Sequence, residues 1–440
     1  MKKKITVIVL FVIILTLICS APVMGQSRTL QQTNDIQIPF TSSGGNQTPL
    51  IHTADNGSLI TVNYPYDPNF FVYDGNGSFL WNATLSAEQS PWISSVSVAP
   101  DGQYLIVTQL VPSCCHGSVT NTSSNKVILF DRSGARLWEY PTYNPPLTST
   151  VSYNNQDFFI GLNDGRIINL DQEGTACWTA QVDAPVLSLT TSADSSTLVA
   201  TGESNYYSNK IYGESLNPHD LFVLDKNGTL LWNYQARGTN TAAVSDDGSM
   251  IAVLNERNGN LLLFNRTGGK QIERSFTGTP SAITMSGDAN LVVVRTREGV
   301  VYGFDRKGSI VWNVSLESES QGIAITDNGK NLILGDGKAI AMYNITANCL
   351  DKYPVDSEVR SIDISPDGKS IIIGTEQNLI VIPAMESVSR TESTILTPIQ
   401  NVHTPGQVPQ TPKESSVFLL IPVFAVGCVI VIRLNRNGKF

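Results

Sequence analysis

The stretch Phe130–Trp138, FDRSGARLW, decides how this chain is organised, because closely similar stretches recur along it. In each copy an aspartate precedes a tryptophan by seven residues, with a glycine between them. The other copies are YDGNGSFLW (Tyr73 to Trp81), LDQEGTACW (Leu170 to Trp178), LDKNGTLLW (Leu224 to Trp232) and FDRKGSIVW (Phe304 to Trp312). Two weaker copies place Asn265 and Asn344 at the aspartate position, and the first of them has Ile272 at the tryptophan position. The spacing of the copies is mostly about 40 residues, which indicates a repeat architecture.

Each copy predicts a β-hairpin. The aspartate side chain can accept a hydrogen bond from the backbone two residues on, and the glycine can take a positive φ. A second kind of hairpin recurs between the copies, at the turns Asp101-Gly102, Asp247-Gly248, Asn328-Gly329 and Asp367-Gly368. Each repeat therefore supplies four short strands, here called a, b, c and d, and no helix. Four strands in about 40 residues are the unit of a β-propeller blade.

The number of b strands predicts eight blades. These strands are expected near Leu59, Leu105, Phe158, Leu198, Met250, Leu291, Leu332 and Ile371. The last repeat, Ser361 to Ile382, lacks a d strand, and residues 35–40 alternate as a lone strand ahead of the first repeat. If that strand completes the last blade, the ring closes. We therefore expect an all-β, eight-bladed β-propeller over residues 35–382, with a seven-bladed ring as the alternative.

The two ends of the chain have a different composition. Lys2, Lys3 and Lys4 precede an apolar run that is too short to span a membrane, so residues 1–25 are predicted to be a secretory signal peptide. Residues 383–415 are rich in Thr, Pro and Ser and predict a stalk. Residues 416–432 carry no charge and predict a transmembrane helix, and the basic tail at 433–440 would then be cytoplasmic. We expect a single-pass protein of the cell membrane with an extracellular propeller.

The charge of the exported part excludes some partners. The formal net charge is -9, and the three N-terminal lysines and three tail cations carry +6, so the remainder carries -15. An acidic ectodomain has no electrostatic means of binding nucleic acid or an anionic membrane surface.

Nine Asn-x-Ser/Thr sequons lie in this exported part, at Asn46, Asn56, Asn76, Asn82, Asn121, Asn227, Asn265, Asn313 and Asn344. They predict a glycoprotein. The alternative is that hairpin turns, which use Asn, Gly, Ser and Thr, produce sequons by chance.

The loops suggest where a partner binds. The b-c connections are tight in most repeats and long in three, at residues 63–69, 110–125 and 203–220. Alternating strand direction puts them all on one face, and variable loops on a rigid scaffold are common binding sites. The candidate contact residues are Tyr64, Tyr66, Cys114, Cys115, His116, Tyr206, Tyr207, Tyr212 and His219. They predict a contact surface for a protein or a surface glycan, and no catalytic set is identified.

The cysteines and the repeat residues have structural interpretations. Cys114-Cys115-His116 is unusual: a vicinal disulfide is the leading interpretation, and a metal site or free thiols are the alternatives. Cys177 and Cys349 are expected to be small core or edge residues. The repeat residues are predicted to form turns and to pack between blades, not to bind calcium, bases or sugars: Asp74, Trp81, Asp131, Trp138, Asp171, Trp178, Asp225, Trp232, Asp305 and Trp312.

The units LFDRSGARLW and VLDKNGTLLW resemble the pyrroloquinoline quinone (PQQ) propeller repeat, and SPDGKSIIIG resembles WD-repeat propellers. Such folds host scaffolds and enzymes alike. The first resemblance implies, as one alternative, a PQQ-dependent quinoprotein dehydrogenase that uses PQQ and calcium, because those enzymes carry a vicinal disulfide that Cys114-Cys115 matches. Their calcium-binding Glu and Asn and catalytic Asp have no identified counterpart here. The order of signal, propeller, stalk, span and basic tail resembles archaeal surface proteins. We therefore expect a non-catalytic binding scaffold without a cofactor, with the dehydrogenase and a structural envelope component as alternatives.

Overall fold

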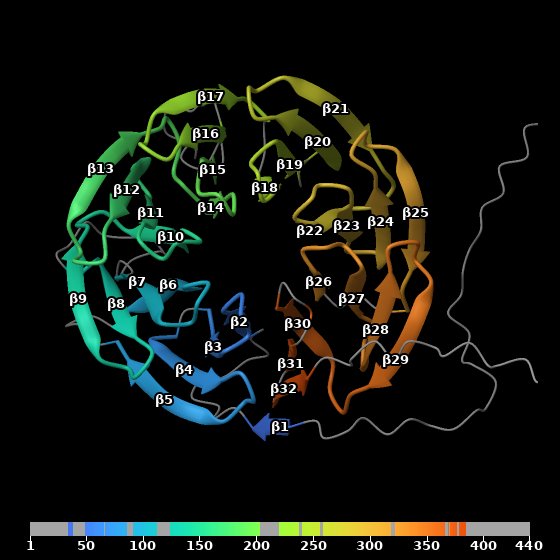
Figure 1. Ribbon diagram of the computed structural model, residues 1–440, viewed down its shortest axis with the longest axis horizontal. Helices are drawn as coiled ribbons and strands as arrows, with labels where there is room; N and C mark the ends of the chain where they lie inside the picture. The colour runs from blue at the N-terminus through green and yellow to red at the C-terminus, as the bar shows by residue number, and fades with distance from the viewer. Residues whose placement is uncertain are drawn as a thin grey trace, which may run out of the picture. The chain divides into compact units, whose positions relative to one another are not determined.

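The propeller is seen in a computed structural model that describes residues 34–37, 49–65, 67–85, 91–111, 124–202, 220–236, 240–255, 258–317, 322–365, 368, 370–375 and 378–383. These residues belong to the first of two units of the chain, Met1–Ser387. All their regular elements are strands, arranged in eight four-stranded antiparallel sheets. The sheets form a ring of eight blades (Figure 1). The prediction of an all-β, eight-bladed propeller is confirmed.

In the order a to d, blades 1 to 4 consist of β2 (Leu50–Thr53), β3 (Leu59–Asn63), β4 (Asn69–Asp74) and β5 (Phe79–Thr84); β6 (Trp92–Val98), β7 (Tyr104–Leu110), β8 (Lys126–Asp131) and β9 (Arg136–Pro141); β10 (Pro146–Val151), β11 (Phe158–Leu162), β12 (Arg166–Leu170) and β13 (Ala176–Gln181); β14 (Ser188–Thr191), β15 (Thr197–Thr201), β16 (Leu221–Asp225) and β17 (Leu230–Tyr234). Blades 5 to 7 consist of β18 (Asn240–Val244), β19 (Met250–Asn255), β20 (Asn260–Asn265) and β21 (Lys270–Ser275); β22 (Pro280–Met285), β23 (Val292–Thr296), β24 (Val300–Phe304) and β25 (Ile310–Ser315); β26 (Ile323–Ile325), β27 (Asn331–Gly335), β28 (Ala339–Asn344) and β29 (Cys349–Pro354).

Blade 8 closes the ring by combining the two ends of the propeller sequence. Its a, b and c strands are β30 (Val359–Ile364), β31 (Ser370–Thr375) and β32 (Asn378–Pro383). Its outermost strand is β1 (Asn34–Gln37), which pairs antiparallel with β32, with Ile36 opposite Leu379. The predicted closure by the early lone strand is therefore confirmed, although residues 38–40 of that prediction lie outside the described part. Closure of this kind leaves no blade one strand short.

The core lies between the blades. Eight apolar clusters occur, and each is built from two neighbouring blades. Successive side chains of a strand point to opposite faces, so Leu59 of β3 packs toward blade 2 and Ile60 toward blade 8. Both faces of the b and c strands are covered, which explains their runs of buried residues. The d strands form the outer rim and have alternating exposure.

The tryptophans connect the outer parts of neighbouring blades. In each of the five repeat tryptophans, the indole Nε1 donates a hydrogen bond to a carbonyl in the c-d turn of the next blade, over 2.8 to 3.1 Å. The pairs are Trp81 with Arg132, Trp138 with Gln172, Trp178 with Lys226, Trp232 with Arg266, and Trp312 with Ile345. The turn glycine lies against the same ring: a Cβ on Gly134 would be 2.8 Å from Cδ2 of Trp81. The predicted packing role of the tryptophans is what the structure shows.

The aspartates shape the c-d turns as predicted. Oδ1 of Asp131 accepts hydrogen bonds from the backbone N–H of Ser133 at 2.8 Å and of Ala135 at 2.9 Å. Gly134 has a φ of +89°. Burial acts to raise the pKa of Asp131, but the hydrogen bond from the Ser133 hydroxyl, together with the backbone hydrogen bonds, outweighs it and the pKa is lowered. Asp74, Asp171, Asp225, Asn265, Asp305 and Asn344 make the same pair of backbone hydrogen bonds.

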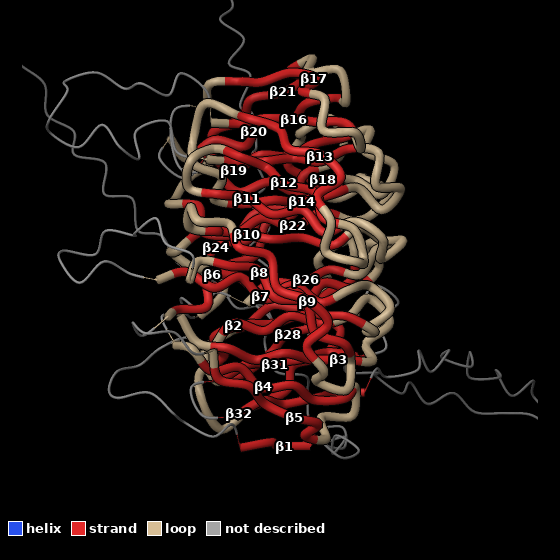
Figure 2. The backbone as a smooth tube through the Cα atoms, turned by 90° about the vertical axis from the view of Figure 1, so that its left-hand side faces the viewer, coloured by secondary structure: helices blue, strands red, loops and turns tan. Residues whose placement is uncertain are grey.

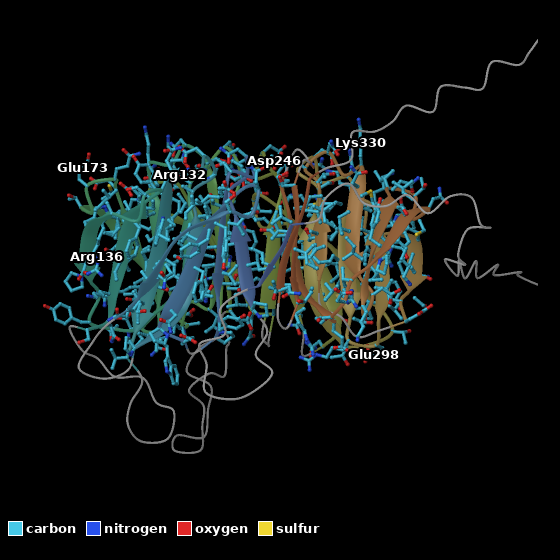
Figure 3. All side chains as sticks on the ribbon, turned by 90° about the horizontal axis from the view of Figure 1, so that it is seen from below. Arg132, Arg136, Glu173, Asp246, Glu298 and Lys330 are labelled. Carbon is cyan, nitrogen blue, oxygen red and sulfur yellow. The ribbon has the colours of Figure 1, made fainter. Side chains whose placement is uncertain are left out.

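The disc has two different faces. Seen from the side, the strands cross its thickness and the described turns lie at its two sides (Figure 2). The a-b and c-d turns share one face, here called the turn face, where Figure 3 shows Arg132, Glu173, Asp246 and Lys330. Glu298, from a b-c turn, lies on the opposite face, here called the b-c face. This is the predicted separation of the connections.

Candidate functional site

The predicted binding site is on the b-c face, and one of its residues has a different role. Tyr64 directly follows β3, and its side chain is only 2% exposed. It packs in the cluster between blades 1 and 8, with Phe71, Tyr73 and Ile372. The reason is strand alternation, because Tyr64 continues the side of β3 that already faces blade 8. Tyr64 is thus a core residue and not a contact residue, which corrects the prediction.

The other predicted contact residues lie outside the described residues. They are Tyr66, Cys114, Cys115, His116, Tyr206, Tyr207, Tyr212 and His219. The proposed vicinal disulfide lies there as well. Cys177 is exposed on the edge strand β13, and Cys349 is half-buried on the edge strand β29; both were expected to be small core or edge residues. The described part of the structure does show how the long connections begin and end.

The stem of the blade 2 connection is held by a buried asparagine. Asn125 is 0% exposed. Its Oδ1 accepts from the backbone N–H of Val111 at 2.8 Å, and its Nδ2 donates to the carbonyl of Tyr143 at 2.8 Å. Beside it, Nε2 of Gln109 donates to the carbonyl of Ser124 at 2.8 Å. These bonds join the two ends of the connection over 112–123 and tie them to the turn that follows strand d.

The other two long connections end on a buried aspartate. In blade 4, Asp220 is 0% exposed, and its Oδ1 accepts from the backbone N–H of Ala236 at 2.6 Å. Its carbonyl accepts from Gly202 N–H at 2.9 Å, which closes the connection over 203–219. In blade 1, Asp67 is 5% exposed, and its Oδ1 accepts from Asn69 N–H at 2.8 Å. The sequence analysis missed these three stem residues. Asp164 and Asn258 stand at the same place before strand c in the tight connections of blades 3 and 5, but they are exposed. The position of an Asn or Asp in the sequence is therefore not a sufficient signal, and its burial distinguishes the long connections.

The turn face has a feature of its own near the axis. The second residues of the eight a-b turns are, from blade 1 to blade 8, Asp55, Pro100, Tyr153, Ala193, Asp246, Gly287, Asp327 and Pro366. The backbone N–H of Asp246 donates to Gly287 O at 2.9 Å, and that of Gly287 donates to Asp327 O at 2.8 Å. These second residues therefore form a connected rim around the inner ends of blades 5 to 7. Each of the four odd-numbered blades contributes an oxygen-bearing side chain at this position, and Asp55 and Tyr153 of blades 1 and 3 interact electrostatically with Asp246 and Asp327.

The carboxylates of this rim repel one another. Burial raises the pKa of Asp55 to about 6, and the negative charges of Asp327, Asp363 and Asp246 add to that effect, whereas a hydrogen bond with Tyr153 lowers it. Burial and nearby negative charges also raise the pKa of Asp246. The rim gives the turn face a negative centre. Among the described residues, no three or more His, Cys, Asp or Glu side chains are grouped as a metal site requires.

The comparisons with known proteins agree with the propeller fold. Residues 123–282 match the family model described as "Outer membrane protein assembly factor BamB", which is a PQQ repeat model. The C-terminal WD40 domain of Sif2 is similar in structure, with a TM-score of 0.59 and 11% identity, covering 82% of this chain and 100% of that domain. BamB from Moraxella catarrhalis has a TM-score of 0.54 and 17% identity, covering 81% of this chain and 100% of that one. No curated protein matches the sequence.

Together these findings support a PQQ-like β-propeller. The structural similarities, at such low identity, concern the fold alone. Within the ranges that the structure describes, no helix is long and apolar enough to cross a membrane, and the predicted span at 416–432 lies outside them. The predicted signal peptide, stalk and cytoplasmic tail lie outside them too.

Proposed function

We propose that the protein is a membrane-anchored, extracellular and non-catalytic scaffold that binds a protein partner through its b-c face. The observation that carries this proposal is the stem geometry: each long connection of the b-c face ends on a buried Asn or Asp that bonds to backbone. Short turns suffice in the other blades, so the three long connections are not needed to join strands. Rigid stems limit the entropy that a loop loses on binding, which favours recognition.

A glycan of the cell surface is the other ligand class that the b-c face could accept. The similarity to BamB, an outer membrane protein assembly factor by its printed description, favours a protein partner. The acidic charge of the exported part favours a partner with a basic contact surface.

The experiment compares the full-length protein with a variant in which residues 204–217 are replaced by a short Gly-Ser linker. Cross-linking in native membranes should identify a partner, whose binding to each purified variant is then measured. We expect the trimmed variant to lose binding and to keep its melting temperature within a few degrees. Glu173→Lys, on the turn face, is the control and should bind as the wild type does. A large fall in melting temperature on trimming, or unchanged binding, would refute the proposal.

The enzyme alternative rests on Cys114-Cys115 and requires bound PQQ with calcium. Addition of PQQ and calcium to the purified protein should then give the cofactor's absorbance and dye-linked alcohol oxidation. The envelope alternative requires self-association without a ligand, which sedimentation of the full-length protein would detect. The scaffold proposal expects neither result.

A further inference from the structure

The outer rim of the propeller exposes pairs of apolar side chains. Strand d begins with Phe79 and Leu80 in blade 1, which are 54% and 40% exposed, and with Ile310 and Val311 in blade 6, which are 49% and 53% exposed. No neighbouring strand covers them, because strand d is the edge of each sheet. Two adjacent large apolar side chains form a small exposed apolar patch that an attached group could cover.

A sequon lies directly beside each of these two pairs. Side chains two residues apart point to the same face of a strand, so Leu80, Asn82 and Thr84 lie together on the exposed face of β5. Val311, Asn313 and Ser315 repeat this arrangement on β25. Trp81 and Trp312 point the other way, into the blade junctions. Both residues of each sequon, Asn and Ser/Thr, are thus on the outside of the molecule.

The rim asparagines differ from the asparagines that build turns. Among the described residues, no hydrogen bond involves the side-chain amide of Asn82 or Asn313. Asn56, in contrast, uses its Nδ2 to donate to Asp101 O at 2.9 Å. In Asn265 and Asn344, Oδ1 accepts two backbone N–H groups and the hydroxyl of the sequon's own threonine. Among the described sequons, Asn82 and Asn313 on the rim, together with Asn227 in the blade 4 turn, have side-chain amides that make no hydrogen bond in the fold.

Each fully apolar pair has a sequon in the same strand or in the adjoining turn, although the turn sequons of blades 5 and 7 adjoin Lys270-Gln271 and Cys349-Leu350 instead. Blade 4 has a third exposed pair, Leu230-Leu231, and a sequon at Asn227 in the adjoining turn. Blades 2 and 3 carry no sequon between Asp and the end of strand d, and the same two positions hold Arg136-Leu137 and Ala176-Cys177. Fully apolar pairs of large residues thus occur on this rim where an attached glycan could cover them.

We propose that Asn82 and Asn313 carry N-linked glycans that lie over the apolar rim pairs of blades 1 and 6. The donor is an oligosaccharide activated on a lipid phosphate. Its C1–O bond to phosphate breaks, a C1–N bond to the asparagine Nδ2 forms, and the displaced amide proton is lost as the lipid phosphate leaves. This inference shares with the proposed function only the extracellular location. Because the rim is neither the b-c face nor the turn face, loss of these glycans should leave partner binding unchanged.

Peptide mass spectrometry of the protein purified from its native membranes tests the sites. We expect a hexose-containing mass increment on the peptides of Asn82 and Asn313, with higher occupancy than at Asn56, Asn265 and Asn344. Gln235→Thr creates a matched sequon at Asn233, which occupies the same exposed position after Trp232 in blade 4, and should add one glycan. Unmodified Asn82 and Asn313 peptides, or the reverse order of occupancy, would overturn the proposal.

Sedimentation tests the covering role. The double variant Asn82→Gln with Asn313→Gln should self-associate at concentrations where the wild type is monomeric. Adding Leu80→Ser and Val311→Ser to that variant should restore the monomer, because one residue of each apolar pair is then removed. A glycan-free variant that stays monomeric, or a glycosylated wild type that self-associates through the rim, would show that the glycans do not cover this surface.

Discussion

The outer and inner ends of the blades are built on different principles. At the outer end, five of the blade junctions use the same indole hydrogen bond, and in four of them the indole lies against a turn glycine. In the fifth, at Trp312, Ala347 takes the glycine position with a φ of +57°. At the inner end, the second residue of the a-b turn changes from blade to blade among Asp, Pro, Tyr, Ala and Gly. The outer positions fill a defined space between two blades, and so they repeat. The inner positions border the axis, where packing demands less, and so they can differ and accumulate charge.

The largest effect is expected at an outer junction, for Trp232→Ala. Trp232 packs on Phe264, with ring centroids 5.3 Å apart, and donates to Arg266 O at 2.8 Å. Its loss opens a cavity and leaves that carbonyl without the indole, so we expect the free energy of unfolding to fall by about 3 kcal/mol. Urea denaturation measures this. Leu231→Ala, at the exposed neighbouring position, should change it by less than about 0.5 kcal/mol; equal effects would contradict the junction's role.

A second test changes the turn glycine at another junction of the same kind, between Gly228 and Trp178. Gly228 has a φ of +80°, and a Cβ there would be 2.5 Å from Cε3 of Trp178. Gly259 has a φ of +66°, but its nearest contact would be at 3.8 Å. We expect Gly228→Ala to cost about 2 to 3 kcal/mol and Gly259→Ala about 1 kcal/mol, because only the first adds a clash to the backbone strain. Paired thermal melts would show a similar loss for both if contact with the indole were unimportant.

The inner end should respond to pH instead. The pKa of Asp55 is raised from 3.8 in the unfolded chain to about 6 in the fold, so the folded state binds this proton more tightly. The resulting stabilisation is present below about pH 4 and is lost as the pH rises through 6. Asp55→Asn, which keeps an acceptor for Tyr153, should therefore equal the wild type at pH 4 and be more stable by about 1 to 2 kcal/mol at pH 7.

A second titratable group, His52, also makes stability depend on pH, so the wild type and Asp55→Asn must be compared at each pH. Burial lowers the pKa of His52 to about 4, so its contribution to stability falls as the pH drops below 6.5. That effect opposes the effect of Asp55 but is common to both proteins and cancels in their difference. Urea denaturation across this pH range measures the difference, and a constant difference between pH 4 and 7 would be the contrary result.

The smallest effect is expected at the junction where Ile272 replaces tryptophan. Ile272 faces Gly308, and this junction has a different donor: Nε of Arg274 donates to Gly308 O at 3.0 Å, not to the turn carbonyl that the indoles use elsewhere. Arg274→Ala should cost about 0.5 to 1 kcal/mol, as a partly exposed hydrogen bond does. Arg274→Lys, which keeps the charge but not the planar donor, should recover at most part of the loss in the same melts. A loss as large as that of Trp232→Ala would show that this junction depends on its donor and not on its apolar packing.

Much of the fold could be predicted because interactions between neighbouring residues within each repeat determine its turns. Asp131 and Gly134 specify a turn, and Trp138 specifies a packing position between blades. The lone strand around Ile36 was expected to complete blade 8 because the last repeat lacks a d strand. Tyr64 was placed wrongly because it was assigned to a loop by its position in a long connection. The alternation of β3 already directed it to the core.

The sequence by itself determined the eight blades, their turns and the separation of the two faces, because hydrogen bonds between near neighbours and the repeated apolar pattern act within a single blade. Only the tertiary structure decided that Asp55, Asp246 and Asp327 share one rim, and that Asn125 and Asp220 hold the stems of the long connections. Those relations join residues that ring closure or a hairpin brings together, and no local pattern encodes the distance between blades on opposite sides of an axis.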